Sequence, residues 1–205
     1  MLNNFTEKTL KDSIPTWHKL PRPGWFIKKK FLNYIKNDKI SGGWMGITES
    51  TPDFLTKTSW EQGGKVEDDL KNLFEECLRS IISKKIKLPF ELHNIWYQQY
   101  GKNTYDTHSY HDHVDEDSSI SGIYYLKLGD INMATEFLYN NKPIIPEVKE
   151  GDLVIFDCAL PHRSPVKTFL NRPVPLTCDK IILSFNLGIK GYENTELAAS
   201  LKEGC

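Results

Sequence analysis

Two histidines and one aspartate in this chain have the types and the spacing of a metal-ligand set. His113-Val114-Asp115 places an imidazole and a carboxylate two residues apart, and a second imidazole follows at His162. Residues i and i+2 of an extended segment point to the same side, so His113 and Asp115 can reach one ion together. Two histidines and one carboxylate are the ligands of non-haem iron(II) sites that leave one face of the metal open. The distant His162 must come from another strand, which requires a β scaffold between the two segments.

A second ligand pair overlaps the first. His111-x-His113 also places two side chains on one side of an extended chain. We assign the primary role to His113 with Asp115, because this pair supplies the carboxylate, and we expect His111 and His108 at the rim of the pocket. The two remaining histidines have no partner close in sequence and are predicted to be structural: His18 and His93.

Composition favours a water-soluble cytoplasmic protein. The net charge of -1 gives no electrostatic reason to expect nucleic acid as a partner. No run of about 18 apolar residues exists, so we expect no membrane span. The four cysteines form no CxxC pair, which argues against a zinc knuckle or a disulfide framework and fits a reducing cytoplasm. The oligomeric state is left open by these features.

The elements that must position the ligands change in character near residue 90. Apolar residues recur with a helical period over 66–82, and a shorter helix is expected within 26–40. Segments rich in Ile, Val, Phe and Tyr then predict a series of strands: 91–100, 122–128, 135–139, 153–156 and 180–189. Helices followed by strands indicate an α+β chain with a β-sandwich or jelly-roll core.

At 205 residues the chain is expected to be one domain. We divide it into a helical and irregular N-terminal support over 1–90, a catalytic β core over 91–190, and a C-terminal tail over 191–205.

The order of motifs resembles a known superfamily. His-x-Asp is followed by Gly-Ile-Tyr-Tyr-Leu at 122–126, Gly-Asp-Leu-Val-x-Phe at 151–156, Pro-His-Arg-Ser-Pro-Val at 161–166, and a cation leading into Ser-Phe-Asn at 184–186. This order is similar to that of the Fe(II)/2-oxoglutarate-dependent dioxygenases, within them the prolyl-hydroxylase-like branch. The resemblance covers about 94–189 and implies a double-stranded β-helix, with Fe(II) held by His113, Asp115 and His162 and with 2-oxoglutarate as cosubstrate.

The resemblance also implies how 2-oxoglutarate is anchored. Relatives use a basic residue on the strand after the distal histidine, and two candidates exist here. Arg172 has the usual sequence distance from the histidine, whereas Lys180 has the usual strand register. We prefer Lys180, because Pro173 and Pro175 place Arg172 in a loop insertion. Two further residues are assigned to the cofactor side: Tyr125, as a hydroxyl donor, and Ser184, on the inward face of the Lys180 strand.

Four residues are assigned to the predicted substrate pocket: Asn186 by strand alternation from Lys180, Gln98 and Tyr100 on the strand before the histidine segment, and His111 at the rim. Tyr124 should point the other way, into the core. The Trp-, Tyr- and Gly-rich segments at 41–64 and 96–110 are expected to form a binding wall. The resemblance implies hydroxylation as the activity, with a small molecule or peptide as partner and an amino-acid or peptidyl side chain as the substrate that the branch suggests.

Two other classes of protein compete with this interpretation. A cupin-like metal enzyme would work without 2-oxoglutarate, but it calls for a glutamate and a further histidine that His111-x-His113 with Glu116 match poorly. A non-enzymatic β-helix binding module would have lost activity, whereas all three predicted ligands are present here.

Overall fold

The computed structural model describes residues 17–38, 57–60, 64–100, 110–114, 118–165, 168–169, 172–173 and 179–202. Its strands are β1 (Trp17–Leu20), β2 (Lys57–Thr58), β3 (Glu91–Tyr100), β4 (Ile120–Leu128), β5 (Glu136–Tyr139), β6 (Lys142–Ile144), β7 (Leu153–Asp157), β8 (His162–Arg163), β9 (Thr168–Phe169), β10 (Arg172–Pro173) and β11 (Lys180–Gly188). Its helices are α2 (Trp25–Asn37), α3 (Gly64–Cys77), α4 (Arg79–Ile86) and α5 (Glu196–Lys202), with 3-10 turns η2 (Ile131–Met133) and η3 (Tyr192–Asn194).

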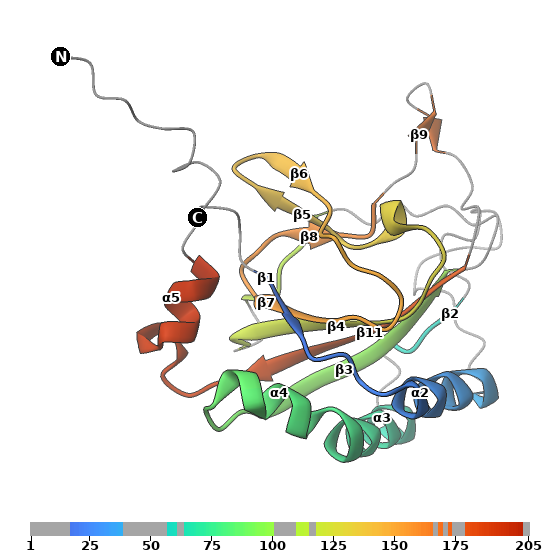
Figure 1. Ribbon diagram of the computed structural model, residues 1–205, viewed down its shortest axis with the longest axis horizontal. Helices are drawn as coiled ribbons and strands as arrows, with labels where there is room; N and C mark the ends of the chain where they lie inside the picture. The colour runs from blue at the N-terminus through green and yellow to red at the C-terminus, as the bar shows by residue number, and fades with distance from the viewer. Residues whose placement is uncertain are drawn as a thin grey trace.

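Two antiparallel sheets form the core of the protein. The larger has the strand order β1-β7-β4-β11-β3-β2, and the smaller has the order β6-β5-β8. Figure 1 shows β5, β6 and β8 above the larger sheet, and α2, α3 and α4 below it. This is the α+β, double-stranded β-helix architecture predicted from the sequence, and each of the five predicted strands is present. No helix among the described residues is long and apolar enough to cross a membrane.

The two faces of the larger sheet bury different kinds of side chain. In β11, the odd-numbered Leu183, Phe185 and Leu187 join the apolar core, whereas Ser184 and Asn186 face the smaller sheet. The same alternation runs through β3, β4 and β7, because successive side chains of a strand point to opposite faces. One face therefore holds the fold together, and the other is available for a site.

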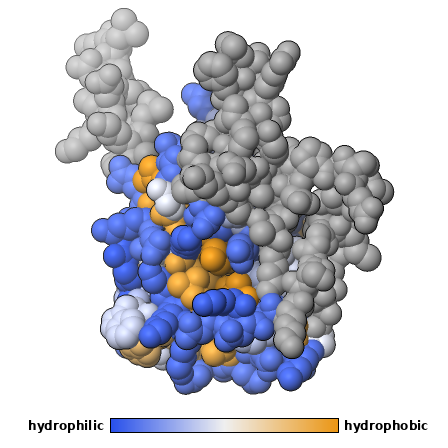
Figure 2. Space-filling view, turned by 90° about the vertical axis from the view of Figure 1, so that its right-hand side faces the viewer, coloured by the Kyte–Doolittle hydropathy of each residue, from blue (hydrophilic) through white to orange (hydrophobic). Residues whose placement is uncertain are grey.

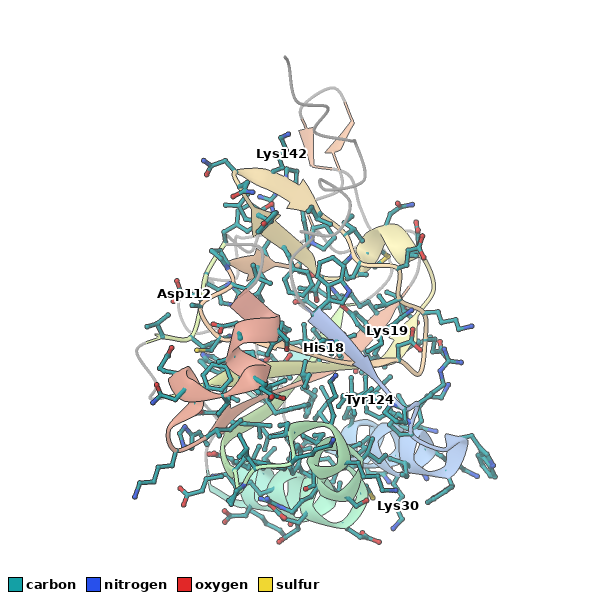
Figure 3. The ribbon with its side chains drawn as sticks, turned by 60° about the vertical axis from the view of Figure 1, so that its left-hand side comes forward. His18, Lys19, Lys30, Asp112, Tyr124 and Lys142 are labelled. Carbon is teal, nitrogen blue, oxygen red and sulfur yellow. The ribbon has the colours of Figure 1, made fainter. Side chains whose placement is uncertain are left out.

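The apolar face is covered by helices. Phe74 of α3 packs edge-on against Phe185 of β11, with ring centroids 5.1 Å apart. Phe31 of α2 meets Tyr124 of β4 in the same geometry at 6.1 Å. Figure 3 shows Tyr124 between the sheet and the helices. Its predicted role in core packing is confirmed.

A glycine makes room for one of these aromatic rings. Gly122 of β4 lies directly opposite Phe185 of β11 in the antiparallel register. A Cβ at position 122 would overlap the ring of Phe185. The absent side chain therefore lets Phe185 lie over the neighbouring strand and reach the helices.

The helix predicted over 66–82 is in fact two helices. α3 ends at Cys77 and α4 begins at Arg79, with Leu78 between them at φ -112° and ψ -32°. The two helices have different neighbours in the sheet, because α3 packs against β3 whereas α4 packs against β1. Apolar spacing continues through the break, so the periodicity alone did not reveal it.

The terminal regions contribute regular structure that the sequence did not indicate. β1 pairs with β7 and β2 pairs with β3, so residues before 90 supply both edges of the larger sheet. The tail contains α5, which packs against β7. The surface visible in Figure 2 is largely hydrophilic among the described residues, with an apolar area in its middle.

Candidate metal centre and cosubstrate pocket

Three histidines gather between the two sheets. Their nitrogen ligand atoms all lie within 4.8 Å of one another: His111, His113 and His162. His162 opens β8, and His111 forms an antiparallel bridge with it. The ring of His162 lies 4.6 Å from that of His111 and 5.2 Å from that of His113, measured between centroids. Only 7% of the surface of His113 and of His162 is exposed, so a bound ion would be largely shielded from water.

The backbone around His162 fixes the orientation of its ring. Nδ1 of His162 lies 3.0 Å from the carbonyl oxygen of Leu160. A neutral imidazole that donates from Nδ1 to this carbonyl has Nε2 available for a metal. The buried rings of Phe156, 4.9 Å away, and Phe137, 6.3 Å away, further restrict His162.

The predicted ligands are only partly placed by the structure. His113 and His162 lie together as predicted, whereas Asp115 falls outside the described residues. His111, which we expected at the rim, lies within the cluster itself. Asp112, between the two neighbouring histidines, is exposed and lies at the surface, as Figure 3 shows. The segment therefore alternates, with histidines inward and the intervening carboxylate outward.

An ion pair ties together the two segments that carry the histidines. Arg163, next to His162, donates from Nε and Nη2 to Oε1 of Glu136 at 2.7 Å each. Tyr110, next to His111, donates its hydroxyl to the same oxygen, and its ring lies 4.2 Å below the guanidinium. Burial, followed by the Glu136 hydrogen bond, raises the pKa of Tyr110 to about 12, so the phenol keeps its proton. We call Tyr110, Glu136 and Arg163 the clasp.

A cavity of about 250 Å³ opens beside the three histidines. Its wall includes residues from β3, β4, β8 and β11, and Ser164 directly after β8: Gln98, Tyr100, Ser121, Ile123, His162, Ser164, Ile182, Ser184 and Asn186. The predicted pocket residues Gln98, Tyr100, His111 and Asn186 all line it, as does Ser184. No acidic side chain lines it among the described residues.

Lys180 is buried behind one end of this cavity. It is 1% exposed, and its Nζ donates to Oγ of Ser164, which lines the cavity. The same Nζ lies 4.7 Å from the centre of the Tyr100 ring, a favourable position for a cation over an aromatic face. A fully buried lysine is uncommon, because burying a charge without a partner is costly. Its position beside Ser164 and Tyr100 gives this end of the cavity a cationic character.

Tyr125 is also buried behind the cavity wall. Its hydroxyl oxygen accepts a hydrogen bond from the backbone N–H of Thr135 at 3.2 Å, and Thr135 lines the cavity. Burial raises the pKa of Tyr125 to about 12. The phenol therefore keeps its own proton available for donation to an acceptor.

The structure describes only the backbone of the other candidate cation, Arg172. Arg172 begins β10, whose backbone pairs with β9 in a short hairpin. Its side chain lies outside the described part of the chain. The predicted preference for Lys180 over Arg172 therefore stays a prediction.

Uncharged polar and aromatic side chains form another part of the cavity wall. Oγ of Ser121 donates to Oδ1 of Asn186 at 2.9 Å, and both residues are almost fully buried. Beside them stand Trp96 and Trp60, whose ring centroids are 4.4 Å apart, and Trp96 lies 5.7 Å from His113. Each of these tryptophans belongs to a segment predicted to form a binding wall. Ser121, Thr135 and Ser164 were not singled out from the sequence, although strand alternation alone indicates the inward position of Ser121.

Solved structures with a similar fold are enzymes of the superfamily that the motifs resemble. A prolyl hydroxylase from Trichoplax adhaerens, solved with a hypoxia inducible factor peptide fragment, matches with a TM-score of 0.57 at 13% identity, over 92% of this chain and 96% of that chain. The non-heme alpha ketoglutarate dependent epimerase SnoN from nogalamycin biosynthesis matches with 0.60 at 8% identity, over 90% and 84%. A Pseudomonas putida prolyl-4-hydroxylase matches with 0.51 at 14% identity, over 86% and 94%.

The sequence itself has no such match. No protein-family model matches this chain, and no curated protein sequence does either. The structural matches show that the fold is shared, and identities of 8 to 14% limit the conclusion to the fold. The double-stranded β-helix predicted from the motif order is confirmed. What the protein does must be argued from its own residues.

Proposed function

We propose that this protein is a non-haem Fe(II)- and 2-oxoglutarate-dependent oxygenase that hydroxylates an unidentified substrate. The observation that carries the proposal is the combination of clustered buried histidines and a buried lysine around one cavity of a double-stranded β-helix. Imidazole nitrogens suit iron, and a buried cation suits the far carboxylate of a keto diacid.

His113 and His162 would supply two ligands to the iron. The sequence assigns the third to Asp115, and the structure adds His111 as a second candidate. With iron and 2-oxoglutarate bound, the centre would supply oxidising power for cleaving a C–H bond, with release of succinate and CO2. The protein's share is to position the reactants and to exclude water, which burial of the histidines favours.

Lys180 and Tyr125 would hold the 5-carboxylate of 2-oxoglutarate. The ammonium of Lys180 already donates to Ser164 at the cavity wall, so a carboxylate there would gain a charge-assisted contact. Tyr125 keeps its proton to well above neutral pH and would add a hydroxyl donor. Lysine offers a point charge without the two-pronged geometry of arginine. Ser184 and Ser164 line the cavity and would add hydrogen bonds to the carboxylate. Arg172 is the alternative anchor.

The uncharged part of the cavity wall would receive the substrate. Gln98, Tyr100 and Asn186 line the cavity, and Trp96 forms an aromatic wall near His113. Such a surface suits a neutral side chain or ring with amide groups nearby, as in an amino acid or a peptide. The similar Trichoplax hydroxylase was solved with a peptide fragment, whereas the similar SnoN is an epimerase, so hydroxylation is the part of this proposal that most needs a test.

The experiment is measurement of succinate released from 2-oxoglutarate after anaerobic loading with Fe(II) and exposure to O2. The wild type is compared with His162→Ala and with His18→Ala, a histidine on β1 that contacts Ser200 instead of the cavity. We expect iron-dependent succinate from the wild type and His18→Ala and none from His162→Ala. Metal binding without succinate, across a panel of amino acids and peptides, would favour a cupin-like enzyme or an inactive binding module.

A further inference from the structure

We propose that a buried pair, Asp157 and Tyr192, positions the candidate metal ligands His113 and His162. Asp157 ends β7, and Tyr192 begins η3, beyond the last strand of the core. This inference deepens the proposed function and rests on it. It gives the C-terminal segment, which the sequence indicated only as a tail, a role in the metal centre.

The pair holds the four residues 157–160, which we call the β7–β8 turn. Oδ2 of Asp157 accepts a hydrogen bond from the hydroxyl of Tyr192 at 3.0 Å, and Oδ1 accepts one from the N–H of Ala159 at 2.9 Å. The carbonyl of Asp157 also accepts from the N–H of Leu160 at 3.0 Å. Asp157 therefore fixes the conformation of the turn and ties it to η3.

Carbonyl groups of this turn contact both histidines. The carbonyl of Cys158 accepts a hydrogen bond from the backbone N–H of His113 at 3.0 Å. The carbonyl of Leu160 lies 3.0 Å from Nδ1 of His162 and thereby restricts the orientation of that ring. A shift of the turn would therefore move the backbone of one candidate ligand and the ring of the other.

The pair is buried, although one of its members is a carboxylic acid. Only 5% of the surface of Asp157 and 4% of that of Tyr192 is exposed. Burying a carboxylate lowers stability unless hydrogen bonds replace its lost hydration. Burial, followed by the charge of Asp157, raises the pKa of Tyr192, so the phenol keeps its proton and remains a donor. An apolar pair would fill the same space, but it could not fix the turn through directional contacts.

Backbone contacts join the C-terminal segment to the same turn. Oγ of Ser119 accepts from the N–H of Ile189 at 3.0 Å, and the carbonyl of Ser119 accepts from the N–H of Cys158 at 3.3 Å. The N–H of Tyr192 donates to the carbonyl of Ile189 at 3.1 Å. Because Tyr192 is held by its backbone as well, loss of the hydroxyl alone should leave the segment in place.

The protein contains a matched pair on the helix side of the larger sheet. Tyr97 of β3 donates its hydroxyl to Oδ2 of Asp38, and Tyr97 belongs to the apolar core instead of the cavity wall. Tyr192→Phe and Tyr97→Phe therefore each remove one phenol hydroxyl that is bonded to a carboxylate. Only the first of these changes acts on the β7–β8 turn.

The test is Co(II) binding by isothermal titration to the full chain, together with the thermal midpoint of each variant. Residues that orient a ligand without binding the metal change its affinity by about 10–100-fold. Because Tyr192 acts through the turn, we expect the lower end of this range, a loss of about 10-fold, for Tyr192→Phe. Tyr97→Phe should bind Co(II) as the wild type does, although its thermal midpoint should fall by a similar amount.

A second variant tests whether the two residues act as a pair. Asp157→Asn keeps an acceptor for Ala159 but presents an NH2 group to Tyr192, so it should weaken Co(II) binding as well. The double variant Asp157→Asn/Tyr192→Phe should bind no more weakly than the weaker single variant, because both changes break the same contact. Losses that add in the double variant would overturn the pairing.

A measurement without metal separates positioning from stability. Nitrogen chemical shifts of the His162 ring, measured by NMR in the metal-free protein, report which ring nitrogen carries the proton. We expect the Nδ1–H form in the wild type and in Tyr97→Phe, and a mixture of both forms in Tyr192→Phe. The mixture would show that the turn has lost its hold on the ring.

The outcomes distinguish this inference from the proposed function. The inference is overturned if Tyr192→Phe binds Co(II) as the wild type does, or if Tyr97→Phe loses as much affinity. Either result leaves the proposed function standing, because that is tested by succinate release. A loss confined to Tyr192→Phe, in a protein whose wild type releases no succinate, would support the positioning role and overturn the proposed function. A wild type that binds no Co(II), Fe(II) or Ni(II) overturns both.

Discussion

The two faces of the larger sheet are made by the same strands but have different roles: one packs against the helices, and the other lines the cavity. Toward the helices, β4 and β11 present Tyr124, Leu183 and Phe185, which pack against Phe31 and Phe74. Toward the smaller sheet the alternate residues of these strands and of β3 form the cavity wall: Gln98, Tyr100, Ser121, Ile182, Ser184 and Asn186. The difference shows how a two-residue period lets one set of strands separate stability from chemistry.

The cavity face carries buried polar groups that the helix face largely avoids. Ser121 and Asn186 bond each other, and Lys180 bonds Ser164, so these groups are hydrogen-bonded although they are buried. Tyr124 is the exception on the helix side, because its buried hydroxyl has no hydrogen-bond partner among the residues that the structure describes. Burying a polar group lowers stability unless the group is hydrogen-bonded, and even a paired group adds little. A set of buried polar groups beside a cavity is therefore better explained by binding of a ligand than by stability of the fold.

Removing an aromatic ring from the helix face should have the largest effect. Phe74 is fully buried and packs on Phe185, so Phe74→Ala should lower the free energy of unfolding by about 3–5 kcal/mol. Urea unfolding measures this loss, and Ser184→Ala on the other face serves as the control with little change. Co(II) affinity of the folded variant should match that of the wild type. A large loss of metal affinity in folded Phe74→Ala would show that the two faces are coupled.

Removing the buried cation should affect the cavity face alone. Lys180→Met should weaken 2-oxoglutarate binding by roughly 10- to 100-fold, because a hydrogen bond to a charged group contributes about 1.5–3 kcal/mol. Equilibrium dialysis with the metal-loaded protein measures the affinity, and Co(II) titration checks that the metal site is intact. Arg172→Met is the matched control and should bind 2-oxoglutarate as the wild type does. The reverse pattern would make Arg172 the anchor.

Weakening the clasp should have a smaller effect on the same face. Glu136→Gln removes the charge that pairs with Arg163 and weakens the contact with Tyr110. Because Glu136 only orients the segments that carry His111 and His162, Co(II) affinity should fall by about 10-fold, the lower end for residues outside the ligand set. Glu67→Gln makes the same change in a partly exposed helical ion pair with Lys71, far from the cavity lining, and should leave the affinity unchanged. If Glu136→Gln and Glu67→Gln bind Co(II) equally well, Glu136 does not position the metal ligands.

The architecture was predictable because long strands carry strong local signals. β3 was expected over 91–100 and occupies those residues, since its ten residues are rich in aromatic and branched side chains. β1 was missed because Trp17–Leu20 is short and follows Pro15, so only its pairing with β7 makes it a strand. The break at Leu78 was missed because apolar residues continue on both sides of it.

Site residues that belong to a sequence motif could be predicted. Site residues that are defined only by a contact between distant segments could not. His113 and His162 were expected together, and the structure places them together. Lys180 and Tyr100 were assigned separately to the cosubstrate and substrate sides of the pocket, and in the structure they face each other across neighbouring strands. Glu136 and Ser164 were not expected, because their roles depend on strands that are far apart in sequence. His111 lines the cavity, as expected, but its place beside His113 and His162 depends on its pairing with His162, which the sequence did not indicate.

Alkaline pH should lower the free energy of unfolding by a modest amount, because phenols on both sides of the larger sheet are harder to ionise in the folded protein. Burial raises the pKa of Tyr125 on the cavity face and of Tyr34 on the helix side to about 12, above the value of about 10 in an unfolded chain. The unfolded state therefore loses these protons first as pH rises. Stability is fully present below about pH 10 and falls between about pH 10 and 12.

Urea midpoints measured at pH 8, 10 and 11, together with phenolate absorbance, test this dependence. Tyr125→Phe and Tyr34→Phe should each make the alkaline decline shallower, because each variant removes one phenol whose pKa is raised in the folded protein. If only Tyr34→Phe does so, the Tyr125 phenol ionises as readily in the folded protein as in the unfolded chain. It would then be a weaker donor to 2-oxoglutarate at high pH than its burial against Thr135 indicates.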